Sequence, residues 1–192
     1  MIIANHVSWL DIFAIHSVRT VRFLAKSEIR RWPLFGWLCA QVGTLFIELT
    51  RLRSIVQINE QVAVALGQGD VFAVFPEGRI SSGNRLLPFN ASLLQPAVAS
   101  GAMLYPVAIR YTRADGGSCE EADYEGDKSM LDSLLLMLTQ PVICARLQFL
   151  PPLACAGRHR RELAYAAAQL ISGALGVPAP RGRNDIPAGP TA

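Results

Sequence analysis

Short apolar runs alternate along most of this chain with stretches in which apolar residues recur at helical spacing. The apolar runs predict strands at residues 1–4, 21–25, 44–48, 71–75, 103–111 and 142–150. The spacing between them predicts helices after Ser8, from Pro33 to Trp37, and at residues 53–66, 92–100, 130–138 and 160–175. Strands separated by helices over 192 residues indicate one α/β domain.

Polar and proline-rich segments interrupt this pattern. Residues 113–128 are polar and rich in glycine and predict a loop, and Pro151-Pro152 predicts the end of the last strand. Beyond Pro178, the content of proline, glycine and arginine predicts disorder. The expected organisation is therefore a domain at residues 1–177 and a disordered tail at residues 178–192.

The first candidate site follows the first strand directly, where residues 5–11 have the sequence NHVSWLD. An imidazole takes a proton from an alcohol near neutral pH, and does so well when a carboxylate holds its other ring nitrogen. Ser8 has the character of a helix N-cap, which places Asp11 at the third helical position and brings its carboxylate back toward His6. The segment predicts a general base, His6, oriented by Asp11.

A structural interpretation fits the same residues. Ser8 and Asp11 also match a capping box, in which Asp11 returns to the backbone amide of the cap and has no other role. A single histidine at a strand end is commonly structural. This segment alone leaves both interpretations open.

A second candidate site follows the predicted strand at residues 71–75, where residues 75–79 have the sequence FPEGR. Proline fixes its φ angle, glycine allows close approach of the backbone, and exposed amides in such a turn can face an anion. Arg79 adds a cation suited to phosphate, although a connecting turn with an exposed arginine is the alternative. Ligands of α/β folds commonly bind at strand ends, so His6 and Glu77 are expected to share one pocket.

Composition narrows the class of function. Hydrophobic residues make up 51% of the chain and charged residues 17%, and the mean hydropathy of +0.29 favours apolar surface or membrane contact. A net charge of +3 without a basic stripe argues against nucleic acid and suits an anionic membrane surface. Four cysteines without CxxC spacing predict no metal site.

Membrane contact is expected to be peripheral. The sequence has neither a signal peptide nor an uninterrupted apolar window of about 18 residues, so the expected location is the cytoplasmic face of the inner membrane. Trp32, Phe35 and Trp37 fit either a membrane interface or core packing.

Together the two candidate sites resemble the 1-acylglycerol-3-phosphate acyltransferase family, also called lysophosphatidic acid acyltransferases. Residues 5–11 match its catalytic block and residues 75–78 its substrate-binding block. Three more segments are similar to its other blocks: FLAKSE at 23–28, GTLFIE at 43–48 and YPVAI at 105–109. The resemblance runs to about Gly176. It implies a single acyltransferase domain of the glycerol-3-phosphate acyltransferase type, with a mixed sheet flanked by helices.

The resemblance implies transfer of a fatty acyl group from acyl-CoA or acyl carrier protein to the hydroxyl of a lysolipid. Lysophosphatidate is the first expected acceptor, with phosphatidate as product. His6 would take the proton from that hydroxyl, Asp11 would orient His6, and neither a covalent acyl-enzyme nor a cofactor or metal is implied. The acceptor head group would contact Lys26, Arg51, Glu77, Gly78 and Arg79.

Residues 86–95 and 124–127 are also similar to bacterial members that act on lyso-ornithine lipid, so that acceptor stays open. Three departures from the family pattern bear on these expectations. Arg79 and Ile80 stand where the family usually has Thr-Arg or Thr-Thr. Leu49 stands where an arginine is usual, with Arg51 as a substitute. Relatives usually carry apolar anchoring segments before the histidine block, whereas this sequence begins just ahead of it, so an anchor segment is expected to be missing.

Two alternatives remain. The departures motivate a catalytically weak or inactive acyltransferase-derived protein that binds lipid. A serine hydrolase would also use His6 and Asp11, but the sequence has no G-x-S-x-G elbow, and Ser8 is too close to His6 to be an obvious nucleophile.

Overall fold

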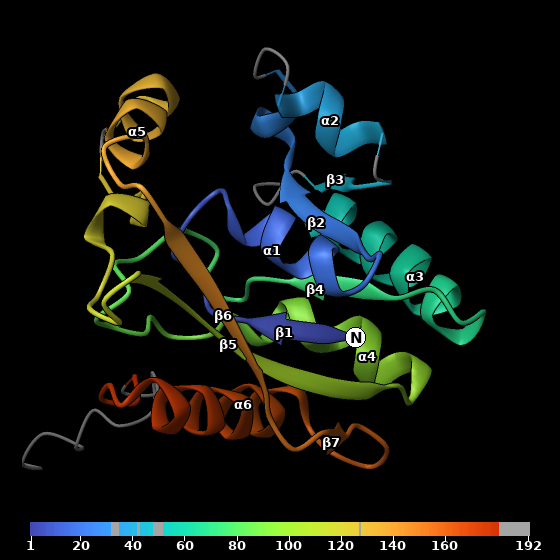
Figure 1. Ribbon diagram of the computed structural model, residues 1–192. Helices are drawn as coiled ribbons and strands as arrows, with labels where there is room; N and C mark the ends of the chain where they lie inside the picture. The colour runs from blue at the N-terminus through green and yellow to red at the C-terminus, as the bar shows by residue number, and fades with distance from the viewer. Residues whose placement is uncertain (32–34, 42, 48–51, 127, 181–192) are drawn as a thin grey trace, which may run out of the picture.

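A mixed β-sheet forms the centre of the computed structural model, which describes residues 1–31, 35–41, 43–47, 52–126 and 128–180. The strand order is β3-β2-β4-β1-β5-β6, and β7 pairs with β5 off this path (Figure 1). The strands are β1 (Ile2–Ala4), β2 (Arg22–Lys26), β3 (Leu45–Ile47), β4 (Phe72–Val74), β5 (Met103–Arg113), β6 (Ile143–Phe149) and β7 (Leu153–Ala154). Strands β1 to β5 are parallel to their neighbours in this order, and β6 and β7 are antiparallel to β5.

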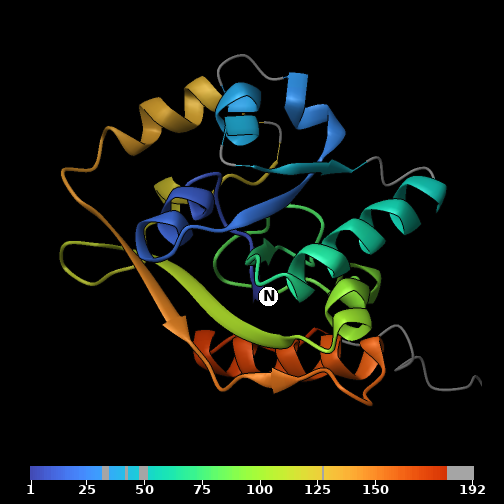
Figure 2. The same cartoon turned by 90° about the vertical axis from the view of Figure 1, so that its right-hand side faces the viewer.

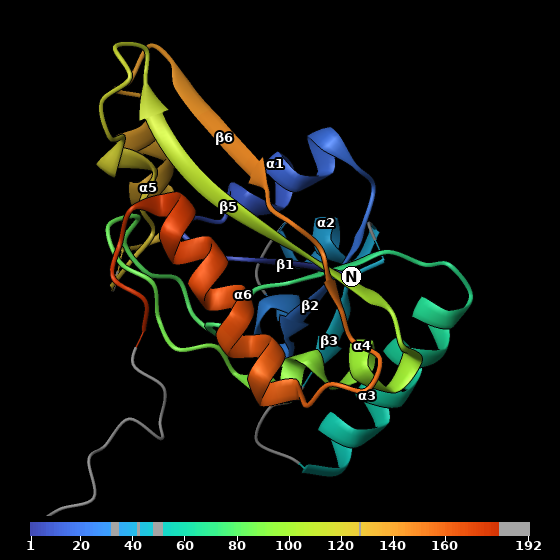
Figure 3. The same ribbon diagram turned by 90° about the horizontal axis from the view of Figure 1, so that it is seen from below.

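Helices cover both faces of this sheet, which confirms the predicted α/β class. They are α1 (Asp11–Val18), α2 (Phe35–Gln41), α3 (Leu52–Gly67), α4 (Gln95–Ser100), α5 (Met130–Met137) and α6 (Arg160–Leu175). Short 3-10 turns lie at Ser27–Arg31, Ala91–Leu94 and Glu120–Ala122. Helix α6 lies along β5 on the opposite side of the sheet from α1 (Figure 3).

Alternation along the central strands sends side chains into two separate cores. Ile3 and Phe72 pack in the core that contains residues of α3, α4 and α6, whereas Ile2 and Ala73 pack in the core that contains Ile15 of α1. All five side chains are buried. Because both faces of these strands are covered, their sequences are continuous apolar runs instead of alternating ones.

The parallel pairing of β1 and β4 creates the site. Ile2 lies opposite Ala73 and Ile3 opposite Val74, so the two strands end side by side at the same edge of the sheet. His6 follows the first strand and Glu77 the second. The two candidate segments, about 70 residues apart in the sequence, therefore meet at that edge, as the sequence predicted.

One local prediction was wrong, and one short strand was not predicted. Helix α1 begins at Asp11, with Leu10 as N-cap and no capping side chain, and the buried Ser8 hydroxyl has no hydrogen-bond partner among the described residues. The predicted strand end at Pro151-Pro152 is confirmed, since β6 ends at Phe149, and the chain pairs again after these prolines, where Leu153–Ala154 forms β7. Strand β6 pairs only with the later part of β5, and β7 pairs with Met103 and Leu104 at its start.

Some predictions fall outside the described residues. These are the helix start at Pro33, the last residue of the predicted strand at 44–48, Leu49 and Arg51, and positions 181–192 of the expected tail. Among the helices that the structure describes, none is both long and apolar enough to cross a bilayer.

Helix α6 offers a test of the core on the β5 side. Ile171 is fully buried, whereas Tyr165 on the same helix is exposed. Replacing Ile171 by Ala should lower the free energy of unfolding by about 2–5 kcal/mol, because the removed atoms leave a cavity. Tyr165→Ala should change it by about 0.5 kcal/mol or less. Urea titration followed by circular dichroism measures both, and equal effects would contradict this placement of α6.

Candidate active site

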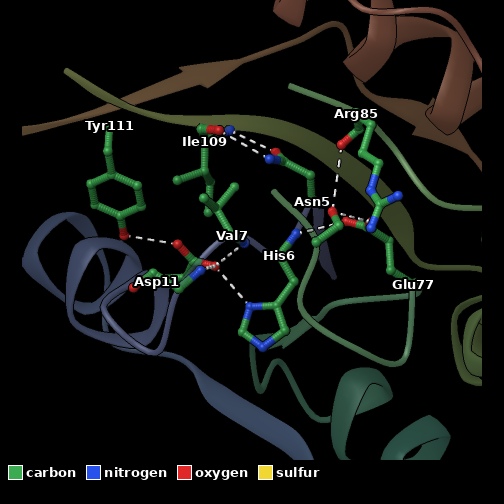
Figure 4. Close-up of polar contacts among 10 residues, drawn as sticks. Asn5, His6, Val7, Asp11, Glu77, Arg85, Ile109 and Tyr111 are labelled. Carbon is green, nitrogen blue, oxygen red and sulfur yellow. Dashed lines mark hydrogen bonds and ion pairs between the residues drawn. The ribbon is translucent and has the colours of Figure 1, made fainter. Parts of the chain in front are cut away.

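Asp11 lies at the start of α1 with its side chain fully buried. Its Oδ2 accepts hydrogen bonds from the backbone N–H groups of Val7 at 2.8 Å and Ser8 at 3.0 Å, and contacts Nδ1 of His6 at 2.7 Å. Its Oδ1 accepts the Tyr111 hydroxyl at 2.8 Å (Figure 4). Four donors therefore satisfy a carboxylate whose burial would otherwise be costly.

These bonds determine the tautomer of His6. The amides and the tyrosine hydroxyl are donors, and the Asp11 carboxylate only accepts, so Nδ1 of His6 carries the ring proton. Nε2 then holds the free lone pair, and no described residue forms a hydrogen bond with it. The His6 side chain is 18% exposed, which leaves this nitrogen available to a bound molecule.

The plane of the imidazole is fixed by aromatic packing. The ring of His6 stacks on Phe75, with ring centroids 4.1 Å apart and an angle of 11° between the planes. Phe75 in turn stacks on Phe23 of β2, at 5.9 Å and 13°. The stack restricts rotation of the imidazole within the site.

Glu77 binds the second candidate segment to the first. Its Oε1 accepts the backbone N–H of His6 at 2.8 Å, and its Oε2 accepts the N–H of Leu87 and the hydroxyl of Ser81, each at 2.9 Å. The backbone N–H of Ser81 donates to the carbonyl oxygen of His6 at 2.9 Å. Burial raises the pKa of Glu77, while its hydrogen bonds from His6, Leu87 and Ser81 oppose that rise.

The turn after β4 places the remaining residues of this segment. Gly78 donates its N–H to the carbonyl of Phe75 at 3.1 Å. Its φ of +70° is a left-handed conformation that favours glycine. Arg79 follows on the exposed side of the turn.

A pocket of about 390 Å³ lies beside this turn. Its lining comprises Arg79, Ile80, Tyr124, Glu125 and Gly126. The loop that contributes the last three is tied to both candidate segments: Tyr124 donates its N–H to the carbonyl of Val7 at 3.0 Å, and Glu125 accepts the N–H of Ser82 at 3.1 Å and pairs with Arg85. The pocket therefore contains a cation, Arg79, and its other wall is held in place by hydrogen bonds to the turn that carries His6.

The side chains of two other predicted site residues lie outside the described part. Lys26 ends β2, and its side chain is not among those described. Arg51 lies outside the described residues. The predicted contacts of Lys26, Arg51, Glu77, Gly78 and Arg79 with a head group remain predictions, and the Glu77 carboxylate is bonded to protein donors.

Two residues in this network had no predicted role. The side chain of Asn5 pairs with the backbone of Ile109 in β5, accepting its N–H at 2.8 Å and donating to its carbonyl at 3.0 Å, so it continues the pairing where β1 ends. Tyr111 projects from the same strand to Asp11. A tyrosine in an apolar strand signals that its hydroxyl needs a partner, but not which one.

The geometry gives no support to a serine hydrolase. The Ser8 hydroxyl is buried without a hydrogen-bond partner among the described residues, and the Ser81 hydroxyl donates to Glu77. Within the described ranges, no group of three or more His, Cys, Asp or Glu side chains is placed to hold a metal ion.

A family model and several known proteins are similar to this chain. A model of the family named Acyltransferase matches residues 1–110. A lyso-ornithine lipid O-acyltransferase of Pseudomonas aeruginosa is 38% identical over 179 residues, covering 93% of this chain and 69% of that protein. A 1-acyl-sn-glycerol-3-phosphate acyltransferase of Neisseria gonorrhoeae is 44% identical over 124 residues, covering 65% of this chain. This chain spans 49% of the length of the Neisseria protein.

The fold is also that of a solved structure. The crystal structure of the 1-acyl-sn-glycerophosphate acyltransferase PlsC from Thermotoga maritima superposes with a TM-score of 0.62 at 24% identity, covering 91% of this chain and 64% of that one. The match confirms the predicted architecture. The family match and the similarity to the Pseudomonas protein confirm the resemblance carried by residues 5–11 and 75–78: this chain belongs to the acyltransferase family.

Proposed function

We propose that this protein transfers a fatty acyl group from a thioester donor to the hydroxyl of a lysolipid, with His6 as the general base. The observation that carries the proposal is the pairing of His6 Nδ1 with the buried carboxylate of Asp11, which leaves Nε2 as an accessible proton acceptor. The names of the two relatives, which specify a lyso-ornithine lipid and 1-acyl-sn-glycerol-3-phosphate, support a lysolipid as acceptor.

The proposed reaction is a direct acyl transfer. Nε2 of His6 takes the proton of the acceptor hydroxyl while its oxygen attacks the thioester carbonyl and forms the new C–O bond. Collapse of the tetrahedral intermediate breaks the C–S bond, and the proton passes from His6 to the leaving thiolate. Asp11 stabilises the imidazolium that exists between these steps. General-base assistance is typically worth about 10²–10⁴-fold, and positioning and oxyanion stabilisation provide the rest.

Glu77 and Phe75 act in this proposal as positioning residues. Glu77 holds the backbone of His6, and Phe75 holds its ring plane. Neither needs to touch the substrate. Their effect is to keep Nε2 directed toward the site of the acceptor hydroxyl.

The acceptor head group is proposed to bind in the pocket that Arg79 lines, with Lys26, Arg51 and Gly78 as further predicted contacts. A guanidinium there suits the phosphate of lysophosphatidate, the first acceptor. Lyso-ornithine lipid is the second candidate, because the Pseudomonas relative aligns with 93% of this chain and Glu125 gives the same pocket an acidic group. The donor, acyl-CoA or acyl carrier protein, and a location at the cytoplasmic face of the inner membrane stay predictions.

The decisive experiment offers the purified protein both donors with a panel of lysolipids and identifies the product by mass spectrometry. An acylated acceptor supports the proposal. Binding of lysolipid without any acyl product would instead support the inactive lipid-binding protein, which the departures at Leu49 and Ile80 motivate. Free fatty acid without an acylated acceptor would indicate a hydrolase.

Replacing His6 by Ala should lower the rate of acyl transfer at least about a hundredfold, because the general base is lost. His159→Asn is the matched control, since His159 is exposed, caps α6 far along the chain, and Asn is also a good N-cap. Circular dichroism should show that both variants fold. Retained activity in His6→Ala would contradict the base assignment.

Replacing Tyr111 by Phe should lower kcat of acyl transfer and leave KM nearly unchanged. Without the Tyr111 hydroxyl, Oδ1 of Asp11 loses its donor, so the carboxylate is held less firmly against Nδ1 of His6. We expect a loss of stability of about 1.5–3 kcal/mol as well, typical of a hydrogen bond to a charged group. Tyr105→Phe on the same strand, where the side chain is exposed, should leave kcat and stability unchanged. An unchanged kcat in Tyr111→Phe, with stability lowered, would show that Tyr111 is structural only.

Replacing Glu77 by Gln should destabilise the fold by about 1–3 kcal/mol, because one amide hydrogen-bond donor would face a backbone N–H that now has an acceptor. Transfer activity should fall with it, chiefly in kcat, since the backbone of His6 loses its anchor. Glu162→Gln, on the exposed face of α6, should change neither by much. Urea titration and steady-state kinetics measure the two effects. A higher KM with unchanged kcat and stability would instead assign Glu77 to head-group binding.

A further inference from the structure

Helix α5 directs its apolar side chains away from the protein. Leu131, Leu134, Leu135 and Leu138 are 63%, 41%, 56% and 71% exposed. Their spacing of i, i+3, i+4 and i+7 places them on one face, and Leu138, the C-cap, keeps helical backbone angles of −68° and −11°. These four residues are called the leucine stripe below.

The inward face of α5 is the less apolar one. Ser133 and Met137 are its buried residues. The Ser133 hydroxyl accepts a hydrogen bond from the indole N–H of Trp9 at 3.1 Å. An amphipathic helix on a protein surface normally turns its apolar stripe toward the core, so α5 has the reverse orientation. A contiguous apolar surface of this kind marks an interaction site.

Helix α5, which carries the leucine stripe outward, is attached to the active site through its inward face. Trp9 lies in the turn between His6 and Asp11, and its contact with Ser133 ties α5 to that turn. The loop before α5 supplies Tyr124 and Gly126 to the pocket beside the site. Figure 2 shows α5, in orange, at the margin of the molecule and well separated from α6.

Few charges lie on α5 itself. Within the helix the charged residue is Asp132, which accepts the hydroxyl of Ser129 at 2.6 Å. Lys128, exposed just before the helix, donates to the carbonyl of Asp123 at 3.2 Å. The loop before α5 is otherwise acidic, with Glu120, Glu121, Asp123 and Glu125. Burial of the apolar stripe, and not attraction to anionic lipid, is therefore the force that would hold this helix in the head-group region of a bilayer.

We propose that the leucine stripe is the surface with which this protein lies on a lipid bilayer. It would hold the pocket beside His6 at the membrane surface, so that a lysolipid can present its hydroxyl while its acyl chain stays in the bilayer. The choice of a bilayer rests on the proposed function in one respect, which is that the acceptor is a lipid. The orientation of the stripe itself does not depend on that function.

The test compares two double variants of the full chain in flotation with vesicles of phosphatidylethanolamine and phosphatidylglycerol. Leu131→Gln/Leu135→Gln removes two members of the stripe. Val56→Gln/Val64→Gln is the matched control, because these valines are 56% and 61% exposed on α3. The stripe variant should partition onto vesicles about tenfold less than the wild type, because two apolar side chains no longer enter the interface. The control should bind as the wild type does.

Each outcome decides the proposal. Equal vesicle binding by the stripe variant and the wild type would overturn it, as would a wild type that binds no vesicles. A wild-type dimer that the stripe variant converts to a monomer, with vesicle binding unchanged, would assign the stripe to contact between two copies and also overturn it. Analytical ultracentrifugation measures that state.

Activity separates this proposal from the proposed function. The stripe variant should lose transfer to lysolipid in vesicles but keep transfer to a short-chain lysolipid dispersed as monomers, because the chemistry at His6 is intact. The His6→Ala variant should bind vesicles as the wild type does. If the wild type transfers no acyl group to any acceptor while vesicle binding still depends on the stripe, the proposed function fails and the membrane surface stands.

Discussion

The buried carboxylate of Asp11 is the interaction on which the rest of the site depends. Its charge is held by donors from three places: the turn after β1, the imidazole of His6 and the hydroxyl of Tyr111 on β5. Each donor offsets part of the cost of removing the carboxylate from water, so none can move without leaving the charge under-satisfied. The same bonds fix the tautomer of His6. The requirement for stability and the requirement for a proton acceptor are thus met by one arrangement.

The structure keeps one element of the capping-box interpretation of Asp11 and otherwise follows the interpretation in which Asp11 orients His6. Asp11 accepts the backbone amide of Ser8, although Ser8 is not the N-cap, and it also accepts from Nδ1 of His6. Glu77 follows the same principle, with both of its oxygens bonded to protein donors. Two carboxylates that are each saturated by donors hold the ends of β1 and β4 in a fixed relation, and that relation places Nε2 of His6 at an accessible position.

The surface of α5 shows where hydrophobic periodicity alone assigns the wrong face of a helix to the core. The hydrophobic content indicates apolar surface, and the aromatic residues Trp32, Phe35 and Trp37 are the visible candidates for it. Periodicity does identify the helix, but an apolar stripe is ordinarily assigned to the core. The contact between Trp9 and Ser133 reverses that assignment, because it turns the serine inward and the leucines outward.

The sequence by itself determined the α/β class, most of the helices and strands, and the pairing of His6 with Asp11, because these depend on local periodicity and on contacts within five residues. It also placed His6 and Glu77 at one edge, since parallel strands end together. Only the tertiary structure decided what holds them. Glu77 meets His6 across 71 residues, Tyr111 meets Asp11 across 100, and Asn5 meets Ile109 across 104. Such partners are chosen by the order of strands in the sheet, which no local pattern of residues specifies.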